Sequence, residues 1–185
     1  VWNLCNEKLQ SGSFKVRDII AASNVKAICT TDDPVDSLEY HEQLAKDETC
    51  NVAVLPAWRP DKAVNIERET FVPYLRQLSE VSEIKIDSFE SLKVALNVRL
   101  DYFNERGCRV SDHGLDYVVY SPASDSEVEN IFATVINGGT VSQEDADKYK
   151  TAIMLHLGKE YANHGIVMQL HYGAQRNTNT KLFER

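Results

Sequence analysis

Short runs of apolar residues alternate with longer amphipathic stretches along the chain. The runs have the length of buried strands, whereas the amphipathic stretches repeat their apolar positions at the spacing of a helix. The pattern predicts strands at 25–31, 52–58, 108–111 and 166–170. It predicts helices over 1–22, 33–46, 87–106 and 142–163, a loop with a short helix over 61–86, and a long connection over 115–141. Each predicted strand therefore follows a predicted helix.

Two segments of the chain share nearly the same pattern. Residues 102–114, "YFNERGCRVSDHG", and 160–173, "EYANHGIVMQLHYG", each combine the end of an amphipathic helix, a glycine, a short apolar strand and a histidine. Gly107 precedes His113 by the same step as Gly165 precedes His171. Glycine can end a helix in the left-handed conformation at little cost. A repeated helix–strand unit is typical of a parallel sheet with helices outside it, so the predicted fold class is α/β.

Polar residues follow the apolar run of each predicted strand. In α/β barrels, the active site is built from residues at the carboxyl ends of several strands. Carboxylate, imidazole and guanidinium groups gathered on one face can bind a metal ion and an anionic substrate. The candidates are Asp32, Asp33, Arg59, Asp112, His113 and His171, with Arg176 in the polar tail that follows.

Each candidate also has a purely structural interpretation. Asp33 before Pro34 is a good start for a helix, and Arg59 has Asp61 nearby as an ion-pair partner. A single histidine such as His171 is often a satisfied core residue. The repeat favours a functional site, because polar groups at equivalent strand ends are expected from the construction of a site and not from packing.

The composition excludes several classes of protein. The chain has 185 residues, of which 43% are hydrophobic, enough for about one domain with a real core. The formal net charge of −8 argues against a nucleic-acid-binding protein, which usually has a basic face. No apolar run is long enough to span a membrane. The four cysteines form no CxxC pair, so we expect a cytoplasmic protein without disulfides. Because the chain starts at Val1 inside a predicted helix, we also expect a piece of a longer protein.

Four ordered segments carry a family resemblance: "ICTTDDPVDSLEYH" (28–41), "VLPAWRPDKAVNIE" (54–67), "GCRVSDHGLDY" (107–117) and "GKEYANHGIVMQLHYGAQRNTNTKLFE" (158–184). They resemble the uronate isomerases, also called glucuronate isomerases, over nearly the whole chain. The resemblance implies a (β/α)8 TIM barrel of the amidohydrolase superfamily. Residues 1–185 would be the central part of that one domain, about strands 2–5, with helical insertions at about 61–106 and 115–163.

The same resemblance implies an activity and roles for individual residues. The reaction would be the aldose–ketose isomerisation of D-glucuronate to D-fructuronate and of D-galacturonate to D-tagaturonate, in cytoplasmic hexuronate breakdown with a divalent metal ion, often zinc. Arg59 would hold the substrate carboxylate. Asp112 and His171 would point into the site, where one of them would transfer a proton between C1 and C2 or orient a metal-bound water. His171 would also be a metal ligand, and His113 and Arg176 would contact substrate oxygens.

The sequence departs from the family pattern at its main metal ligands. A His-x-His pair on the first strand and an Asp on the last strand are both missing from it. We therefore expect the longer protein to be an isomerase and the chain alone to be inactive. Unpaired strand edges would favour its association into a homo-oligomer. Two alternatives remain open: a metal-dependent hydrolase of the same superfamily, and a folded fragment without turnover.

Overall fold

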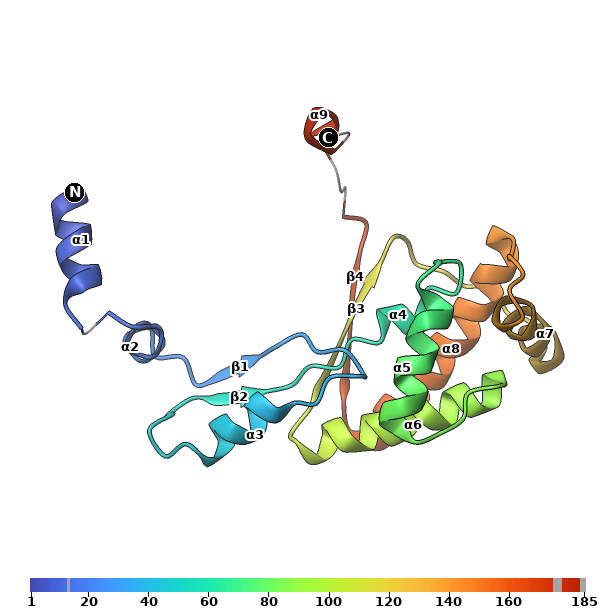
Figure 1. Ribbon diagram of the computed structural model, residues 1–185, viewed down its shortest axis with the longest axis horizontal. Coiled ribbons are helices and arrows are strands. Elements are labelled where there is room, and N and C mark those ends of the chain that lie inside the picture. Colours follow the sequence, from blue (N-terminus) through green and yellow to red (C-terminus); the bar gives the residue numbers. More distant parts are fainter. Residues whose placement is uncertain (13, 175–177, 184–185) are drawn as a thin grey trace.

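The chain folds into short parallel strands separated by helices, as the apolar pattern predicts (Figure 1). The computed structural model describes residues 1–12, 14–174 and 178–183. The strands are β1 (Ala27–Cys29), β2 (Ala53–Leu55), β3 (Val110–Leu115) and β4 (Val167–Tyr172). The helices are α1 (Trp2–Gln10), α2 (Val16–Ala22), α3 (Glu39–Lys46), α4 (Asp61–Val64), α5 (Phe71–Ser82), α6 (Phe89–Glu105), α7 (Asp125–Ile136), α8 (Gln143–His164) and α9 (Thr180–Phe183).

The strands form two parallel pairs that meet at Trp58. β1 pairs with β2, and β3 pairs with β4. Between the pairs, Trp58 makes one isolated parallel bridge to Asp32 and another to Ser111. Its amide donates to Val110 O at 3.1 Å, and its carbonyl accepts from the Asp112 amide at 2.9 Å. The segment that follows β2 therefore lies beside β3, and the carboxyl ends of the strands come together.

The pairing of β3 with β4 places the two histidines of the repeat on opposite faces. His113 is paired with Leu170, and His171 is paired with Gly114, so the repeat is offset by one residue in the structure. Successive side chains of a strand point to opposite faces, so a shift of one residue exchanges the faces. The prediction that Asp112 and His113 form a polar tip after the strand was wrong, because β3 continues through both of them to Leu115.

A helical layer packs against β3 and β4 and supplies most of the core. In Figure 1, α5, α6, α7 and α8 gather on one side of these strands, whereas α1 and α2 extend away from the rest of the molecule. The amphipathic helix predicted over 87–106 buries one apolar face as α6, formed by Phe89, Leu92, Leu96, Leu100 and Phe103. Trp58 meets Phe103 edge-to-face, with ring centroids 5.0 Å apart. In the part of the chain that the structure describes, no helix is long and apolar enough to cross a membrane.

Helix ends agree only partly with the sequence prediction. Gly165 ends α8 with φ +66°, as predicted, and Ser142, where the helix was predicted to start, is its cap and accepts from the Asp145 amide at 3.1 Å. The start of α6 was predicted one residue early, because Ser88 is its cap and accepts from the Ser91 amide at 3.1 Å.

Three predicted elements were wrong. The helix predicted over 1–22 is two helices, α1 and α2. Asp33-Pro34 does not start a helix; Asp33 instead accepts from the Val35 amide at 3.2 Å in a local turn, and α3 begins at Glu39 after Leu38, which has φ +55°. The connection 115–141 contains α7, which the pattern had not revealed.

Candidate active site

Arg59 lies where the two strand pairs meet. Its amide donates to Asp32 O at 2.9 Å, which continues the bridge made by Trp58. Its Nε donates to Asp61 Oδ2 at 2.8 Å, and its Nη1 donates to Asp112 Oδ2 at 3.2 Å. The hydrogen bond to Asp61 raises the pKa of the Arg59 guanidinium, while burial acts in the opposite direction. The Arg59 side chain is 33% exposed, so its guanidinium still faces solvent although two carboxylates hold it.

Asp112 is a largely enclosed carboxylate that links Arg59 to β4. Its side chain is 14% exposed, and Oδ2 also accepts from Thr31 Oγ1 at 3.3 Å. Its Oδ1 lies 3.1 Å from Nε2 of His171. Even so, Oδ1 is buried and accepts no hydrogen bond from the residues that the structure describes. The contact with His171 compensates the burial of Oδ1 when the imidazole carries a proton, and a bound ligand can donate to Oδ1 in its place.

His171 completes a row of three polar side chains that come from three separate parts of the chain. Arg59 follows β2, Asp112 lies in β3 and His171 lies in β4. The His171 side chain is 57% exposed, so it is free to contact a bound molecule. An acid, a base and a cation within reach of one another can bind an anion and move a proton.

His113 does not join this row, and its predicted substrate contact has no geometric support. Its side chain is fully buried on the opposite face of β3, where Nε2 lies 3.0 Å from the hydroxyl of Tyr161. Burial lowers the pKa of His113 to about 4, so the imidazole is neutral at pH 7. The strand alternates its faces, and this places His113 in the core although Asp112 beside it faces the site.

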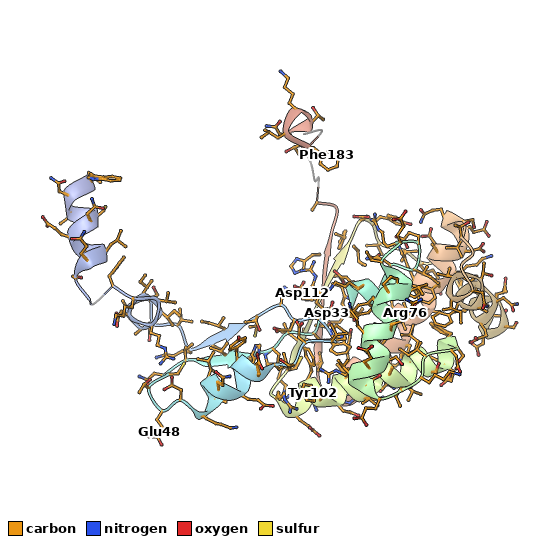
Figure 2. All side chains as sticks on the ribbon, viewed as in Figure 1. Asp33, Glu48, Arg76, Tyr102, Asp112 and Phe183 are labelled. Carbon is orange, nitrogen blue, oxygen red and sulfur yellow. The ribbon has the colours of Figure 1, made fainter. Side chains whose placement is uncertain are left out.

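Two hollows flank Arg59. One has a volume of about 320 Å³ and lies along the loop after β3. The other, of about 300 Å³, is lined by Thr31, Asp32, Asp33, Asp36, Arg59, Asp61 and Lys62. In Figure 2, Asp33 and Asp112 both lie in the central part of the view. Small polar molecules therefore have access to Arg59 from two sides.

Asp32 and Asp33 hold the loop together. Asp32 Oδ2 accepts from the Thr30 hydroxyl at 2.6 Å and from the Ala57 amide at 3.2 Å. Asp33 accepts from the Tyr74 hydroxyl at 2.9 Å and pairs with Lys62 at 3.2 Å. Both carboxylates line the smaller hollow, but both oxygens of Asp33 and Oδ2 of Asp32 already have protein partners.

The predicted metal site is not complete in this part of the protein. Among the described residues, no three His, Cys, Asp or Glu side chains are grouped as a metal ion would need. Asp112 and His171 offer two donors side by side, fewer than a typical zinc site takes from the protein. Arg176, the remaining predicted residue, lies outside the described residues.

Three residues around the site had not been selected from the sequence for these roles. The sequence suggests Asp61 only as an ion-pair partner of Arg59, whereas in the structure it also accepts from the Gly114 amide at 3.1 Å. Gly114 lies directly under the guanidinium. Arg99, 7% exposed, donates to the carbonyls of Pro34 and Asp36 at 2.6 and 2.8 Å and so holds the loop after β1. Asp61 lies in the "RPD" string and Gly114 in the "DHG" string, but the roles of both residues depend on contacts across the sheet.

Comparison with known proteins identifies the family. The profile of the family described as glucuronate isomerase matches residues 1–185. The chain belongs to the glucuronate isomerase family. The uronate isomerase of Lachnoclostridium phytofermentans is 53% identical over 185 residues, which are 100% of this chain and 40% of that protein. The uronate isomerase of Lachnospira eligens is 55% identical over 179 residues, 97% of this chain and 38% of that protein. This family member therefore spans about 40% of the length of these relatives.

Solved structures of the same family have the same arrangement of elements. The crystal structure of uronate isomerase from Thermotoga maritima superposes with a TM-score of 0.83 at 30% identity, over 91% of this chain and 37% of that one. Glucuronate isomerase from Caulobacter crescentus gives a TM-score of 0.82 at 28% identity, over 93% of this chain and 36% of that one. The parallel α/β arrangement of this family member is thus shared with both.

Proposed function

We propose that the protein containing this chain is a uronate isomerase, which interconverts D-glucuronate with D-fructuronate and D-galacturonate with D-tagaturonate. The observation that carries this proposal is the 53% identity over all 185 residues to a protein named uronate isomerase. The row of Arg59, Asp112 and His171 supports it, because these side chains suit an acidic sugar. A (β/α)8 barrel, membership of the amidohydrolase superfamily and a cytoplasmic location are parts of the same proposal, with residues 1–185 as its central part.

Arg59 binds the carboxylate of the uronate in this proposal. A guanidinium meets a carboxylate through two parallel hydrogen bonds, which fixes orientation as well as supplying binding energy. Arg59 Nη2 donates no hydrogen bond within the described residues, so it is available to the substrate. Holding the far end of the sugar in this way brings C1 and C2 to one defined position.

Asp112 and His171 serve the proton transfers. Isomerisation moves the proton on C2 to C1 and the hydroxyl proton on O2 to O1, through an enediol. A base must take the C2 proton while an acid serves the carbonyl oxygen. Asp112 Oδ1, which has no hydrogen-bond donor among the described residues, and the exposed His171 imidazole are the two groups placed to exchange these protons.

A divalent metal ion, with zinc as the first candidate, is a further part of the proposal. Such an ion supplies electrostatic stabilisation of the oxygen charge that develops during isomerisation. The described residues do not form a complete site for it, since they contain no group of three suitable ligands. Among the described residues, His171 is the candidate ligand, with the Asp112 carboxylate beside it.

Turnover by the full-length protein tests the proposal. With D-glucuronate and added Zn²⁺, we expect the aldose signal in the proton NMR spectrum to be replaced by signals of the ketose. In D₂O, deuterium at C1 or C2 would report exchange of the transferred proton with solvent. The absence of any ketose after metal reconstitution would overturn the proposal. Hydrolysis of a lactone or ester substrate instead would support the hydrolase alternative.

A further inference from the structure

The guanidinium of Arg59 lies directly on the backbone of Gly114. A Cβ atom built at Gly114 would lie 2.5 Å from Arg59 Nη2 and 3.6 Å from its Cζ. Real Cβ atoms do not approach a nitrogen atom so closely, so any side chain at this position would displace the guanidinium. Arg59 therefore occupies the space that a side chain at residue 114 would fill.

Backbone conformation does not explain this glycine. Gly114 lies inside β3, paired with His171, and is not among the glycines with positive φ. Glycine weakens the interior of a strand, and where it occurs it often marks a close approach by another group. Here the approaching group is Arg59, on the face of the strand that also carries Asp112.

Asp61 holds the same guanidinium from a second direction. Its Oδ2 accepts from Arg59 Nε at 2.8 Å and from the Gly114 amide at 3.1 Å. Its Oδ1 lies 3.9 Å from Nδ1 of the buried His113. One carboxylate therefore ties Arg59 to the backbone of β3, and Asp61 itself is fixed as the first residue of α4.

We propose that Gly114 and Asp61 are positioning residues that fix the Arg59 guanidinium for a substrate carboxylate. This inference rests on the function proposed above and adds the means by which Arg59 is oriented. Asp61 accepts the Nε hydrogen and Asp112 accepts one of the two Nη1 hydrogens. Nη2 lies against the backbone of Gly114, so the second Nη1 hydrogen and those of Nη2 are left for a ligand. The arrangement predetermines which edge of the guanidinium meets the carboxylate.

A Gly114→Ala substitution in the full-length protein tests this inference. The clash falls on the end of a flexible side chain, so the protein is expected to fold while the guanidinium moves. We expect KM for D-glucuronate to rise by about ten- to a hundredfold, with kcat changed by less than about threefold, because the lost contact to the carboxylate is made equally in the ground state and the transition state and the proton-transfer groups stay in place. Calorimetric titration with D-glucuronate should show the same loss of affinity.

Gly158→Ala is the matched control. A Cβ at Gly158, in α8, meets only Met168 Sδ at 3.8 Å, an ordinary contact, so KM should not change.

For Asp61, the asparagine variant keeps one acceptor oxygen, so Asp61→Ala should raise KM more than Asp61→Asn. An unchanged KM in the folded Gly114→Ala protein, or equal KM values for both Asp61 variants and the wild type, would overturn the inference.

A crystal structure of the Gly114→Ala protein tests the inference independently of activity. We expect the guanidinium to leave the surface of residue 114 and its hydrogen bond to Asp61 to lengthen or break. An unmoved guanidinium would contradict the inference whether or not the protein isomerises uronates. Conversely, a wild-type protein that fails to convert D-glucuronate would count against the proposed function. The positioning of Arg59 by Gly114 and Asp61 would then be decided by the crystal structure alone.

Discussion

Arg59 and Asp112, 53 residues apart in the sequence, are joined by a 3.2 Å hydrogen bond between Nη1 and Oδ2. The contact exists because the segment after β2 bridges to β3 through Trp58. It leaves one oxygen of Asp112 without a hydrogen-bond donor among the described residues and directs that oxygen toward His171. A cation that binds an anion and a carboxylate that can exchange a proton are thereby held beside each other.

Replacing Arg59 by alanine should abolish most uronate binding. If the guanidinium pairs with the substrate carboxylate, the Arg59→Ala protein should bind D-glucuronate more weakly by about 2–5 kcal/mol. Binding can be measured by calorimetry on the full-length protein. Arg76→Ala is the control, because Arg76 is exposed on α5 and lies away from Asp112 in Figure 2. A neutral hydrolase substrate would predict almost no difference between the two variants.

Replacing Arg99 by methionine should destabilise the loop after β1. The change removes the buried guanidinium together with its two hydrogen bonds. The carbonyls of Pro34 and Asp36 are left without that donor. We expect a loss of about 3 kcal/mol in the free energy of unfolding by urea, with faster proteolysis within 31–38. Lys93→Met on the same helix, which removes a surface ion pair, should cost less than about 1 kcal/mol. Equal costs for both variants would contradict the proposed role of Arg99.

The burial of His113 predicts a loss of stability in weak acid. Its pKa is about 4 in the folded protein and about 6.5 when unfolded, so the unfolded state binds more protons between these values. The stabilising effect of the neutral imidazole is present above about pH 6.5 and is lost as the pH falls toward 4, on the order of 3 kcal/mol in all. Urea unfolding of the His113→Gln protein should therefore depend less on pH over this window.

His164 provides a control of opposite sign for the same experiment. Its hydrogen bond to Asp101, at 2.7 Å, raises the pKa of His164. Its contribution to stability is full below about pH 6.5 and is lost as the pH rises through the folded pKa. The His164→Gln protein should thus lose more stability at low pH than at high pH. If the free energy of unfolding changed with pH equally in the wild type and the His113→Gln protein, the predicted titration of His113 would be excluded.

The left-handed residue at the end of α5 offers a stabilising substitution. Glu83 has φ +59° at the C-cap, a conformation that costs about 1 kcal/mol for a residue with a Cβ atom. Glu83→Gly should raise the free energy of unfolding by about 0.5–1 kcal/mol. The reciprocal change, Gly165→Ala at φ +66°, should lower it by about 1 kcal/mol although its Cβ would meet nothing within 4 Å. Urea midpoints that shift in the same direction for both would contradict this explanation.

The repeated unit shows how far the sequence could predict the site. Helix, glycine and strand were correctly expected in both copies, since Gly107 and Gly165 both have positive φ and β3 and β4 run in parallel. Equivalent roles for His113 and His171 did not follow, because strand register depends on contacts between strands that are far apart in sequence. With the offset of one residue, Asp112 shares the face of His171, and His113 packs against Tyr161.

The sequence by itself determined most of the local structure and the family. Apolar runs, serine caps and helix-ending glycines act over a few residues, so they are visible without a fold, and four strings were enough to indicate the uronate isomerases. Only the tertiary structure decided which polar residues meet. The tie between Arg59 and Asp61 over Gly114, and the hold of Arg99 on the loop after β1, depend on segments that meet across the sheet and its helical layer. Such contacts follow from packing and strand register, which no short stretch of sequence specifies.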